Sequence, residues 1–202
     1  MSPDELVAGL RDRTGAGRLI VGIAGEPGAG KSTLAARIAE QLGPHAVVLP
    51  MDGFHLPQAR LVELGRRERM GAPDTFDVDG FLRVLEAVRD DAGEVAAPGF
   101  DRDVEEPVPG AIRIRPEHRV VIVEGNYLLH DAGGWERALS LLDVSVSLSA
   151  DPGIRLDRLI ARHIAHGKTP DAARAWATGP DEANAALIRG TACRADEVVV
   201  VD

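Results

Sequence analysis

Eight consecutive residues combine glycines, a lysine and a serine in an order suited to binding phosphate groups. The run Gly25–Ser32 reads GEPGAGKS and fits the P-loop pattern, in which two glycines separated by four residues precede a lysine and a serine or threonine. Such a loop turns its backbone amides toward the phosphates, while Lys31 can reach the β- and γ-phosphates and Ser32 can offer its hydroxyl to Mg²⁺. We therefore expect nucleotide phosphates to be bound by Gly25, Glu26, Pro27, Gly28, Ala29, Gly30, Lys31, Ser32 and Thr33.

The flanking sequence favours this interpretation over that of an ordinary glycine-rich turn. The apolar, β-branched run Leu19–Ala24 precedes the loop and predicts a buried strand. Residues 31–42 follow it with helical spacing of Leu34 and Ile38, and Gly43 predicts the end of that helix. A strand, a phosphate loop and a helix in this order are the structural context that the motif requires.

Acidic residues follow two further predicted strands. Asp52 comes shortly after Ala46–Leu49, which we expect to be a second buried strand, and Glu124 follows Arg119–Val123. Ligands of open α/β sheets bind beyond the carboxyl ends of the strands. Asp52 could therefore accept the proton of a hydroxyl that attacks the γ-phosphate, or could serve as a turn residue or an indirect Mg²⁺ ligand. Glu124 could assist Mg²⁺, orient the substrate or cap the next turn, and Asn126 either packs and hydrogen-bonds locally or contacts a ligand.

Three arginines share one face of a predicted helix that begins after Asp151. Arg155, Arg158 and Arg162 lie three and four residues apart, a spacing that places them together. Arginines that close over a transferring phosphoryl group stabilise its charge and help to exclude water. We expect Arg158 and Arg162 to act in catalysis with Lys31 and Asp52. The alternative is a solvated basic face paired with Asp151 or Asp157.

The order of the predicted elements indicates the α/β class. Strands alternate with helices, which predicts a doubly wound, mostly parallel sheet with helices on both faces. We expect one domain over residues 1–202, with acceptor-side insertions at 51–78 and 98–116 and a lid region at 151–178. Further expected helices cover 3–14, 58–64, about 77–90 with Asp77 or Asp79 as cap, 172–177 and 182–189; further strands cover 144–148 and 198–201, and 98–116 is a loop or small hairpin.

Composition narrows the classes of function. The formal net charge is −9, which argues against a nucleic-acid partner. A single cysteine, Cys193, rules out an internal disulfide framework, and we expect it to be buried. No apolar run approaches the roughly 18 residues that span a membrane, and the acidic N-terminus lacks a signal segment, so we expect a cytoplasmic protein. A homodimer is compatible with this sequence, although no segment identifies an interface.

Several motifs occur together in a specific order between residues 18 and 190. They are GEPGAGKS, MDGFHLP, GAPDTFDVDGF, PGFDR, VVIVEGNYLL and the helix RLDRLIARH. In this combination the chain resembles the uridine kinase, pantothenate kinase and phosphoribulokinase family, and is most similar to its short bacterial members, described as nucleoside or sugar kinase-like.

The resemblance implies a three-layer P-loop NTPase fold with a small helical lid and ATP–Mg²⁺ as phosphate donor. By analogy Asp52 is the base, Glu124 serves Mg²⁺, and the helix with Arg155–Arg162 is the lid. Asp101 and Arg102 fall where family members contact the acceptor. His55 stands beside the base and is either an acceptor ligand or a structural residue.

The acceptor itself stays open at this point. The chain lacks the His-Ser-Arg segment of uridine kinases and is much shorter than typical bacterial pantothenate kinases and phosphoribulokinases. We expect transfer to a hydroxyl of a nucleoside, a sugar or a pantothenate-like metabolite. The alternatives are an ATP-binding sensor without productive transfer and an ATPase coupled to a partner. Arg66, Arg67 and Arg69 are either solvated or hold an acidic group of the acceptor, and Trp176 could shape the closed lid.

Overall fold

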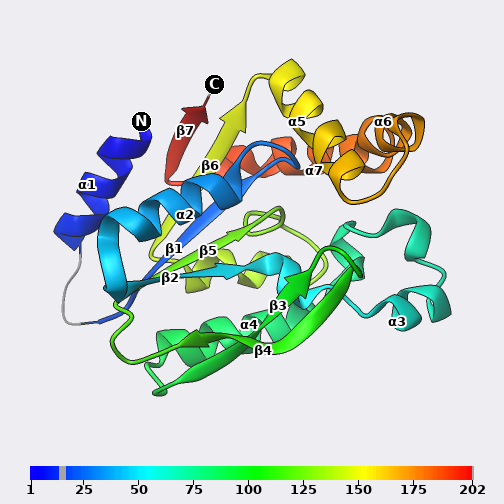
Figure 1. Cartoon of the computed structure of the whole chain (residues 1–202). Coiled ribbons are helices and arrows are strands. Elements are labelled where there is room, and N and C mark those ends of the chain that lie inside the picture. Colours follow the sequence, from blue (N-terminus) through cyan, green and yellow to red (C-terminus); the bar gives the residue numbers. More distant parts are fainter. Residues whose placement is uncertain (14–16, 202) are drawn as a thin grey trace.

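The computed structural model describes residues 1–13 and 17–201. Over these residues the central sheet has five parallel strands in the order β2-β5-β1-β6-β7. Their bounds are β1 (Leu19–Gly25), β2 (Ala46–Pro50), β5 (Val120–Gly125), β6 (Val144–Ala150) and β7 (Glu197–Val201). Figure 1 shows the sheet running through the middle of the molecule, with helices in front of it and behind it.

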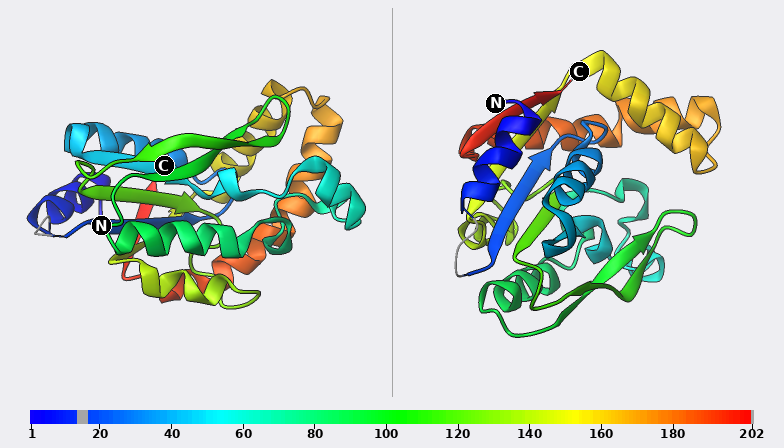
Figure 2. Two further views of the ribbon diagram at one scale, coloured as in Figure 1. Left: turned by 90° about the horizontal axis from the view of Figure 1, so that it is seen from below. Right: turned by 60° about the vertical axis from the view of Figure 1, so that its left-hand side comes forward.

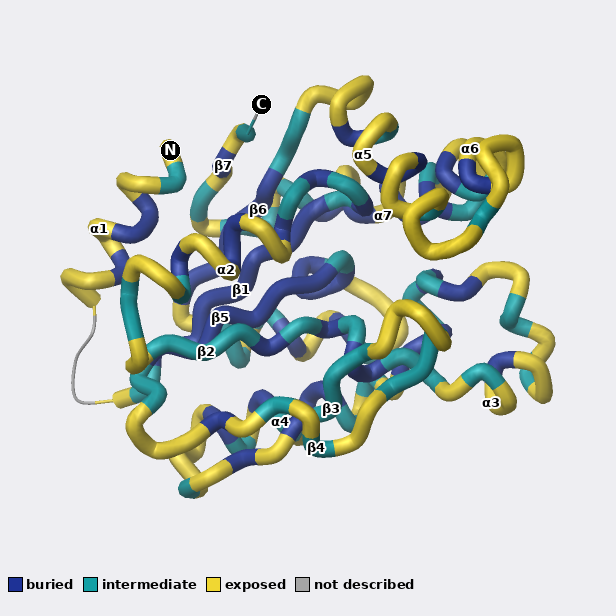
Figure 3. The backbone as a smooth tube through the Cα atoms, in the orientation of Figure 1, coloured by how far each residue is buried: buried dark blue, intermediate teal, exposed yellow. Residues whose placement is uncertain are grey.

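Burial follows the position of each strand in the sheet. Every residue of β1 and β5 is buried, because both strands have neighbours on each side and helices over both faces. Figure 3 shows these two strands as a continuous buried centre. Strand β2 lies at an edge and, apart from Leu49, is half-buried, so the expectation of a fully buried second strand is wrong.

Alternating side chains divide the core into two layers, one on each face of the sheet. Val21 and Ile23 of β1 pack with α1 (Pro3–Arg13) and α2 (Lys31–Leu42). Ile20 and Ala24 pack on the opposite face with the bulky residues of α4 (Val78–Arg89) and with Ile188 of α7 (Pro180–Thr191). The views in Figure 2 show these layers on the two sides of the strands. The expected three-layer, doubly wound α/β fold is therefore confirmed.

The carboxyl ends of the strands meet in register. Gly25 pairs with Leu148 across β1 and β6, and Pro50 pairs with Glu124 across β2 and β5. The segments that follow these strands, including the phosphate loop and the 3-10 turn Met51–Phe54, therefore converge at one edge of the sheet.

A two-stranded antiparallel hairpin packs against the turn that carries Asp52. It consists of β3 (Val95–Asp101) and β4 (Glu106–Ile114), with a register shift between Ala97 and Gly99. The sequence predicts a loop or small hairpin beginning at Pro98, whereas the structure shows ordered pairing from Val95. Val95 and Ala97 are buried against the core, and this burial explains the longer strand.

Three helices lie near the carboxyl edge of the sheet on the side of the phosphate loop. They are α5 (Pro152–Ala165), α6 (Pro170–Thr178) and α7. Leu159 and Ile160 of α5 pack with Ala173 and Ala177 of α6 in a small core of their own. Asp151 accepts hydrogen bonds from the amides of Gly153 and Ile154, so it caps α5 and does not pair with an arginine of this helix.

The remaining elements agree with the predicted positions in most cases. Helix α1 covers the predicted range up to Arg13, and Thr14 lies outside the described residues. Helix α3 (Gln58–Glu63) is present, and Asp77 caps α4 through the amide of Gly80. Cys193 is exposed, contrary to expectation. Among the described helices, none has the length and apolar character that a membrane crossing needs.

Replacement of Gly53 by alanine tests the packing of the hairpin on the turn that carries Asp52. A Cβ at this position would lie 2.1 Å from the carbonyl oxygen of Pro98, so the backbone must shift. We expect Gly53→Ala to lower the free energy of unfolding by about 1–3 kcal/mol, measured by chemical denaturation. The matched control is Gly9→Ala in α1, where nothing lies within 4 Å of the added Cβ; this change should stabilise the protein by about 0.5–1 kcal/mol. Equal effects of the two variants would contradict the close approach.

Candidate active site

The phosphate loop joins β1 to the first turn of α2. Gly28 and Gly30 have φ angles of 83° and 95°, in the left-handed region that favours glycine. Lys31 is the first residue of α2, and its Nζ donates a hydrogen bond of 3.0 Å to the carbonyl oxygen of Glu26. The loop therefore curls around its own lysine at the positive end of a helix, where anions bind favourably.

Burial makes the charged form of Lys31 unfavourable. Burial lowers the pKa of Lys31 from its ordinary value to about 8, although the carboxylates of Glu124 and Asp52 act in the opposite direction. At pH 7 the side chain of Lys31 is therefore still mostly protonated, although burial disfavours its positive charge. A bound anion in the loop would favour the charged form.

Ser32 and Glu124 form an oxygen pair beside the lysine. The hydroxyl of Ser32 donates a hydrogen bond of 2.9 Å to Oε1 of Glu124. Burial, followed by the nearby charge of Asp52, raises the pKa of Glu124. Two hard oxygen ligands next to a phosphate loop suit Mg²⁺, which is commonly held by one or two protein groups together with substrate phosphates. The residues present therefore fit this ion.

Asp52 lies in the turn after β2 and is held by an arginine from the hairpin. Nη2 of Arg102 donates a hydrogen bond of 2.6 Å to Oδ2 of Asp52. Burial opposes ionisation of Asp52, but nearby positive charges outweigh it and lower its pKa: that of His55 when this ring is protonated at acid pH, and those of Arg102 and Lys31. Asp52 is consequently ionised at neutral pH and can accept a proton.

His55 is fixed between two aromatic rings. Its ring centroid lies 4.0 Å from that of Phe76 and 4.8 Å from that of Phe100. Its Nδ1 lies 2.8 Å from the backbone oxygen of Asp52, which can only accept, so Nδ1 carries the proton. Burial lowers the pKa of His55, and the neutral ring therefore keeps Nε2 as a hydrogen-bond acceptor.

A cavity of about 130 Å³ opens beside Asp52, and we call it the chamber. One buried water needs roughly 10–15 Å³ on this measure, so the chamber has room for a small molecule. Its walls are polar and charged, with aromatic and apolar side chains at intervals. The lining residues are Pro27, Lys31, Ser32, Asp52, His55, Arg67, Met70, Gly71, Phe76, Phe100, Arg102, Glu105, Glu124, Asn126, Arg162, His163, Lys168, Trp176, Asp181 and Asn184.

A second cavity of about 430 Å³ follows the phosphate loop. It is lined by Gly28, Gly30, Lys31, Ser32, Thr33, Arg102, Arg158, Arg162 and His166. Lys31, Ser32, Arg102 and Arg162 line both cavities. The two spaces therefore adjoin at the lysine and serine of the loop.

A protein-family model described as "Phosphoribulokinase / Uridine kinase family" matches residues 20–200. The chain belongs to this family. Its homology with kinases of the family supports an ATP-dependent kinase.

Individual members of the phosphoribulokinase / uridine kinase family show further similarity. "Uncharacterized protein YggC" of Escherichia coli is 37% identical over 83% of this chain and 71% of its own length. A pantothenate kinase of Leifsonia xyli is 38% identical over 70% of this chain but 46% of its own length. The crystal structure of a "putative fructose transport system kinase" from Silicibacter sp. TM1040 is 40% identical, with a TM-score of 0.89 over 98% of each chain.

Within this kinase-family chain, Arg155 differs from the other two arginines of α5. It is buried, and it donates to the backbone oxygen of Pro27 at 3.1 Å, pairs through Nε with Glu26 at 3.2 Å and also bonds Glu182. Arg158 and Arg162, in contrast, line the cavity along the phosphate loop. The expectation of a basic face paired with Asp151 or Asp157 is therefore wrong for Arg155, which ties the phosphate loop to α5 and α7.

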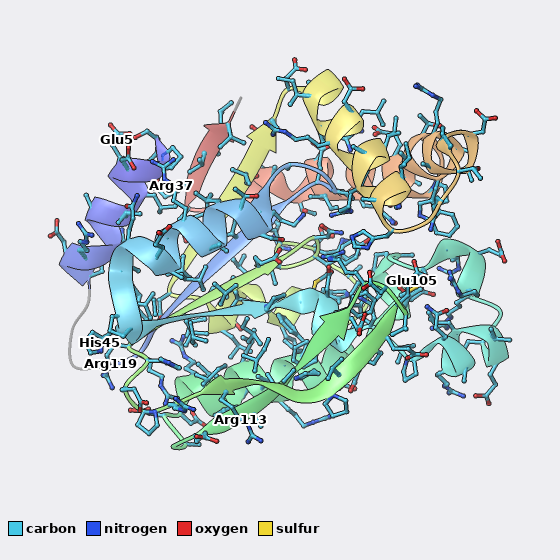
Figure 4. The ribbon with its side chains drawn as sticks, in the orientation of Figure 1. Glu5, Arg37, His45, Glu105, Arg113 and Arg119 are labelled. Carbon is cyan, nitrogen blue, oxygen red and sulfur yellow. The ribbon has the colours of Figure 1, made fainter. Side chains whose placement is uncertain are left out.

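The arginine cluster of the 51–78 segment is divided between two roles. Arg66 and Arg69 both pair with Asp74, at 3.3 and 2.5 Å, and brace the loop. Arg67 lines the chamber and pairs with Glu105 at 2.5 Å. Figure 4 labels Glu105 at the end of the hairpin that faces this segment.

Two residues predicted to contact the acceptor, Asn126 and Asp101, occupy different surroundings. Asn126 lines the chamber, next to Glu124. Asp101 is exposed, and its Oδ1 accepts hydrogen bonds from the amides of Asp103 and Val104, so it stabilises the hairpin turn. It is not among the residues that line the chamber.

Apart from Trp176, sequence reasoning missed the residues of the chamber wall that come from the last helices. His163 and Asp181 pair at 2.7 Å, and Lys168 lies 5.1 Å from the ring of Trp176. Asn184 completes this wall from α7. No motif marks these residues; the available signal was the polar spacing of Asp181 and Asn184, three residues apart on a predicted helix.

Replacement of Lys31 by methionine should reveal the energetic strain of the site. In the ligand-free protein at pH 7 we expect Lys31→Met to raise the free energy of unfolding by roughly 1–3 kcal/mol, because a buried charge is removed. The folded protein releases this proton near pH 8, and the unfolded chain near pH 10.4. Between these two pH values the unfolded chain binds more protons than the folded protein, so the stability of the wild type rises with pH. The difference in the free energy of unfolding between Lys31→Met and the wild type should therefore narrow.

Denaturation curves between pH 7 and 10 measure this effect. The other lysine of the chain provides the control, since Lys168→Met removes a half-buried amine at the chamber wall and should give no such gain. A loss of stability in Lys31→Met at pH 7 would refute the argument.

Proposed function

We propose that this chain is an ATP- and Mg²⁺-dependent kinase that transfers the γ-phosphoryl group to a hydroxyl of a small metabolite in the chamber. The observation that carries the proposal is the junction of the two cavities. Lys31, Ser32 and Arg162 line both the space along the phosphate loop and the space beside Asp52. A nucleotide in one cavity would therefore present its terminal phosphate to a molecule in the other.

In this proposal Asp52 is the general base. It is ionised, lines the chamber and is oriented by the 2.6 Å hydrogen bond from Arg102. A carboxylate in this position can take the proton of the acceptor hydroxyl as the oxygen attacks phosphorus. Asn126 and Nε2 of His55 are available to orient the same molecule.

The cations around the junction stabilise charge on the phosphoryl group. Lys31, Arg158 and Arg162 line the loop cavity, where negative charge spreads over the equatorial oxygens during transfer. Ser32 and Glu124 would hold Mg²⁺, which supplies positive charge at the β- and γ-phosphates. Residues 25–33 hold the nucleotide phosphates in this assignment.

Three segments enclose the acceptor. We assign residues 51–78 and 98–116 to the acceptor side of the domain and residues 151–178 to the lid. Each segment contributes chamber residues: Arg67 and Met70 from the first, Arg102 and Glu105 from the second, and Arg162 and Trp176 from the third. Their closure around the substrate would exclude the water that otherwise hydrolyses ATP.

The competing hypothesis is a sensor that binds ATP without transferring phosphate. The polar chamber next to an ionised Asp52 favours transfer, since a sensor needs neither a base nor an enclosed second site. A panel assay separates the two: purified protein with ATP–Mg²⁺ and nucleosides, sugars, sugar phosphates or pantothenate, with ADP measured. Acceptor-dependent ADP formation above background hydrolysis supports the kinase, and tight ATP binding without such turnover across the panel favours the sensor.

Substitution of Asp52 tests its role as the base. We expect Asp52→Asn to lower kcat by about 100-fold or more while the affinity for ATP is retained, because the amide cannot accept the proton. Asp131→Asn is the matched control, since that carboxylate is exposed and lies outside both cavities. Steady-state kinetics with the acceptor found in the panel measure both variants. Unchanged turnover in Asp52→Asn would refute the assignment.

A further inference from the structure

Asn184 is a buried polar residue without a protein partner. It lies in α7, is 6% exposed and lines the chamber. Its side-chain amide makes no hydrogen bond with any of the residues that the structure describes. The amide atoms are nevertheless not among the fully buried unpaired polar atoms of the described residues, so they face the space of the chamber. Most buried side-chain polar atoms in proteins are paired, and this unpaired amide is therefore available for a ligand.

Asp181 stands one turn earlier on the same helix and is also nearly buried, at 8% exposure. Nε2 of His163 lies 2.7 Å from its Oδ2. An ionised carboxylate can only accept, so His163 donates this hydrogen bond and fixes the carboxylate. No second hydrogen bond to Asp181 occurs within the described part of the chain, and Oδ1 is therefore open to the chamber's contents.

The spacing of these two residues makes them neighbours. Positions 181 and 184 are three apart on a helix, which places their side chains on one face. Asp181 supplies an acceptor, and the amide of Asn184 supplies both donors and an acceptor. A hydroxyl can donate to the carboxylate while it accepts from the amide, and an adjacent hydroxyl can donate to the amide oxygen. Trp176 lines the same chamber and offers an apolar ring to the carbon skeleton between such groups.

We propose that Asp181 and Asn184 form a subsite for a vicinal diol of the phosphate acceptor, with His163 as a positioning residue. This inference rests on the proposed kinase function and narrows its substrate class to carbohydrates. The diol can belong to a free sugar or to the ribose of a nucleoside. Pantothenate does not fit, because its two hydroxyls are not on adjacent carbons.

Matched pairs of ligands test the subsite by titration calorimetry in the presence of a non-hydrolysable ATP analogue and Mg²⁺. The probes are fructose, methyl ribofuranoside, methyl 2-deoxyribofuranoside, uridine, 2′-deoxyuridine and pantothenate, and the furanoside ring keeps the 2-deoxy sugar from presenting a diol at C3 and C4. We expect a diol to bind about 10- to 100-fold more tightly than its deoxy counterpart, the range for one or two lost hydrogen bonds. The sugars and the nucleosides form separate arms, and the arm that shows this preference identifies the source of the diol.

Variants of α7 tie the preference to the two residues. Asn184→Ala and Asp181→Asn should abolish the difference in affinity between the diol and the deoxy ligand. Asn184→Leu should abolish it as well, and the melting temperature should not fall, since no protein hydrogen bond is lost. Leu187→Ala is the matched control, because Leu187 is exposed on the same helix. A clear loss of stability in Asn184→Leu would indicate a structural role and overturn the subsite.

Binding and turnover together separate the two proposals. Phosphotransfer to an acceptor with an undiminished diol preference in Asn184→Ala overturns the subsite and leaves the kinase proposal intact. Variant-sensitive diol binding without phosphotransfer supports the subsite and contradicts the kinase proposal. Equal binding of diol and deoxy ligand, a response to pantothenate alone, or no binding by any probe overturns the subsite.

Discussion

The confinement of opposite charges at the carboxyl edge of the sheet is the constraint on which the rest of this structure depends. Lys31, Asp52, Arg102 and Glu124 share one partly enclosed space, and burial there disfavours the ionised forms of Lys31, Asp52 and Glu124, while neighbouring charges act in part against it. The balance differs among the three groups whose pKa values shift: those of Lys31 and Asp52 fall, whereas that of Glu124 rises. Such a cluster is strained without a ligand, and a polyanion with its counter-ion would relieve the strain on Lys31 and Glu124 together.

The fold holds these charges close because small residues let separate loops touch. A Cβ on Gly125 would lie 2.5 Å from the Cβ of Met51, so the end of β5 and the turn after β2 are in direct contact. Gly53 meets the backbone of the hairpin in the same way. Asp52 is therefore fixed from two sides, and the parallel register of β2 and β5 brings it to the same edge as Glu124. The precision of the site comes from the backbone and needs few specific side-chain contacts.

Features with a local physical signature could be read from the sequence. Neighbouring residues determine the phosphate loop, the helix from Lys31 to Leu42 and the acidic residues at the ends of β2 and β5. The α/β fold follows from the alternation of strands and helices along the chain. Contacts between distant elements could not be read. The burial of Arg155 depends on carboxylates at positions 26 and 182. The wall formed by His163, Asp181 and Asn184 exists because the pairs Arg155–Glu182 and His163–Asp181 join α5 to α7. The exposure of Cys193 likewise depends on its place in a 3-10 turn before the edge strand β7.

The buried contact of Arg155 with the loop between β1 and α2 has a consequence for how the two ends of α5 are held. Arg155 lies in the first turn of α5 and bonds the backbone of Pro27, and His163 in the last turn pairs with Asp181 of α7. Arg158 and Arg162 lie between these two anchors and line the cavity along the loop. The helix is thus a span supported at both ends, and its supports set how far these two arginines stand from the loop.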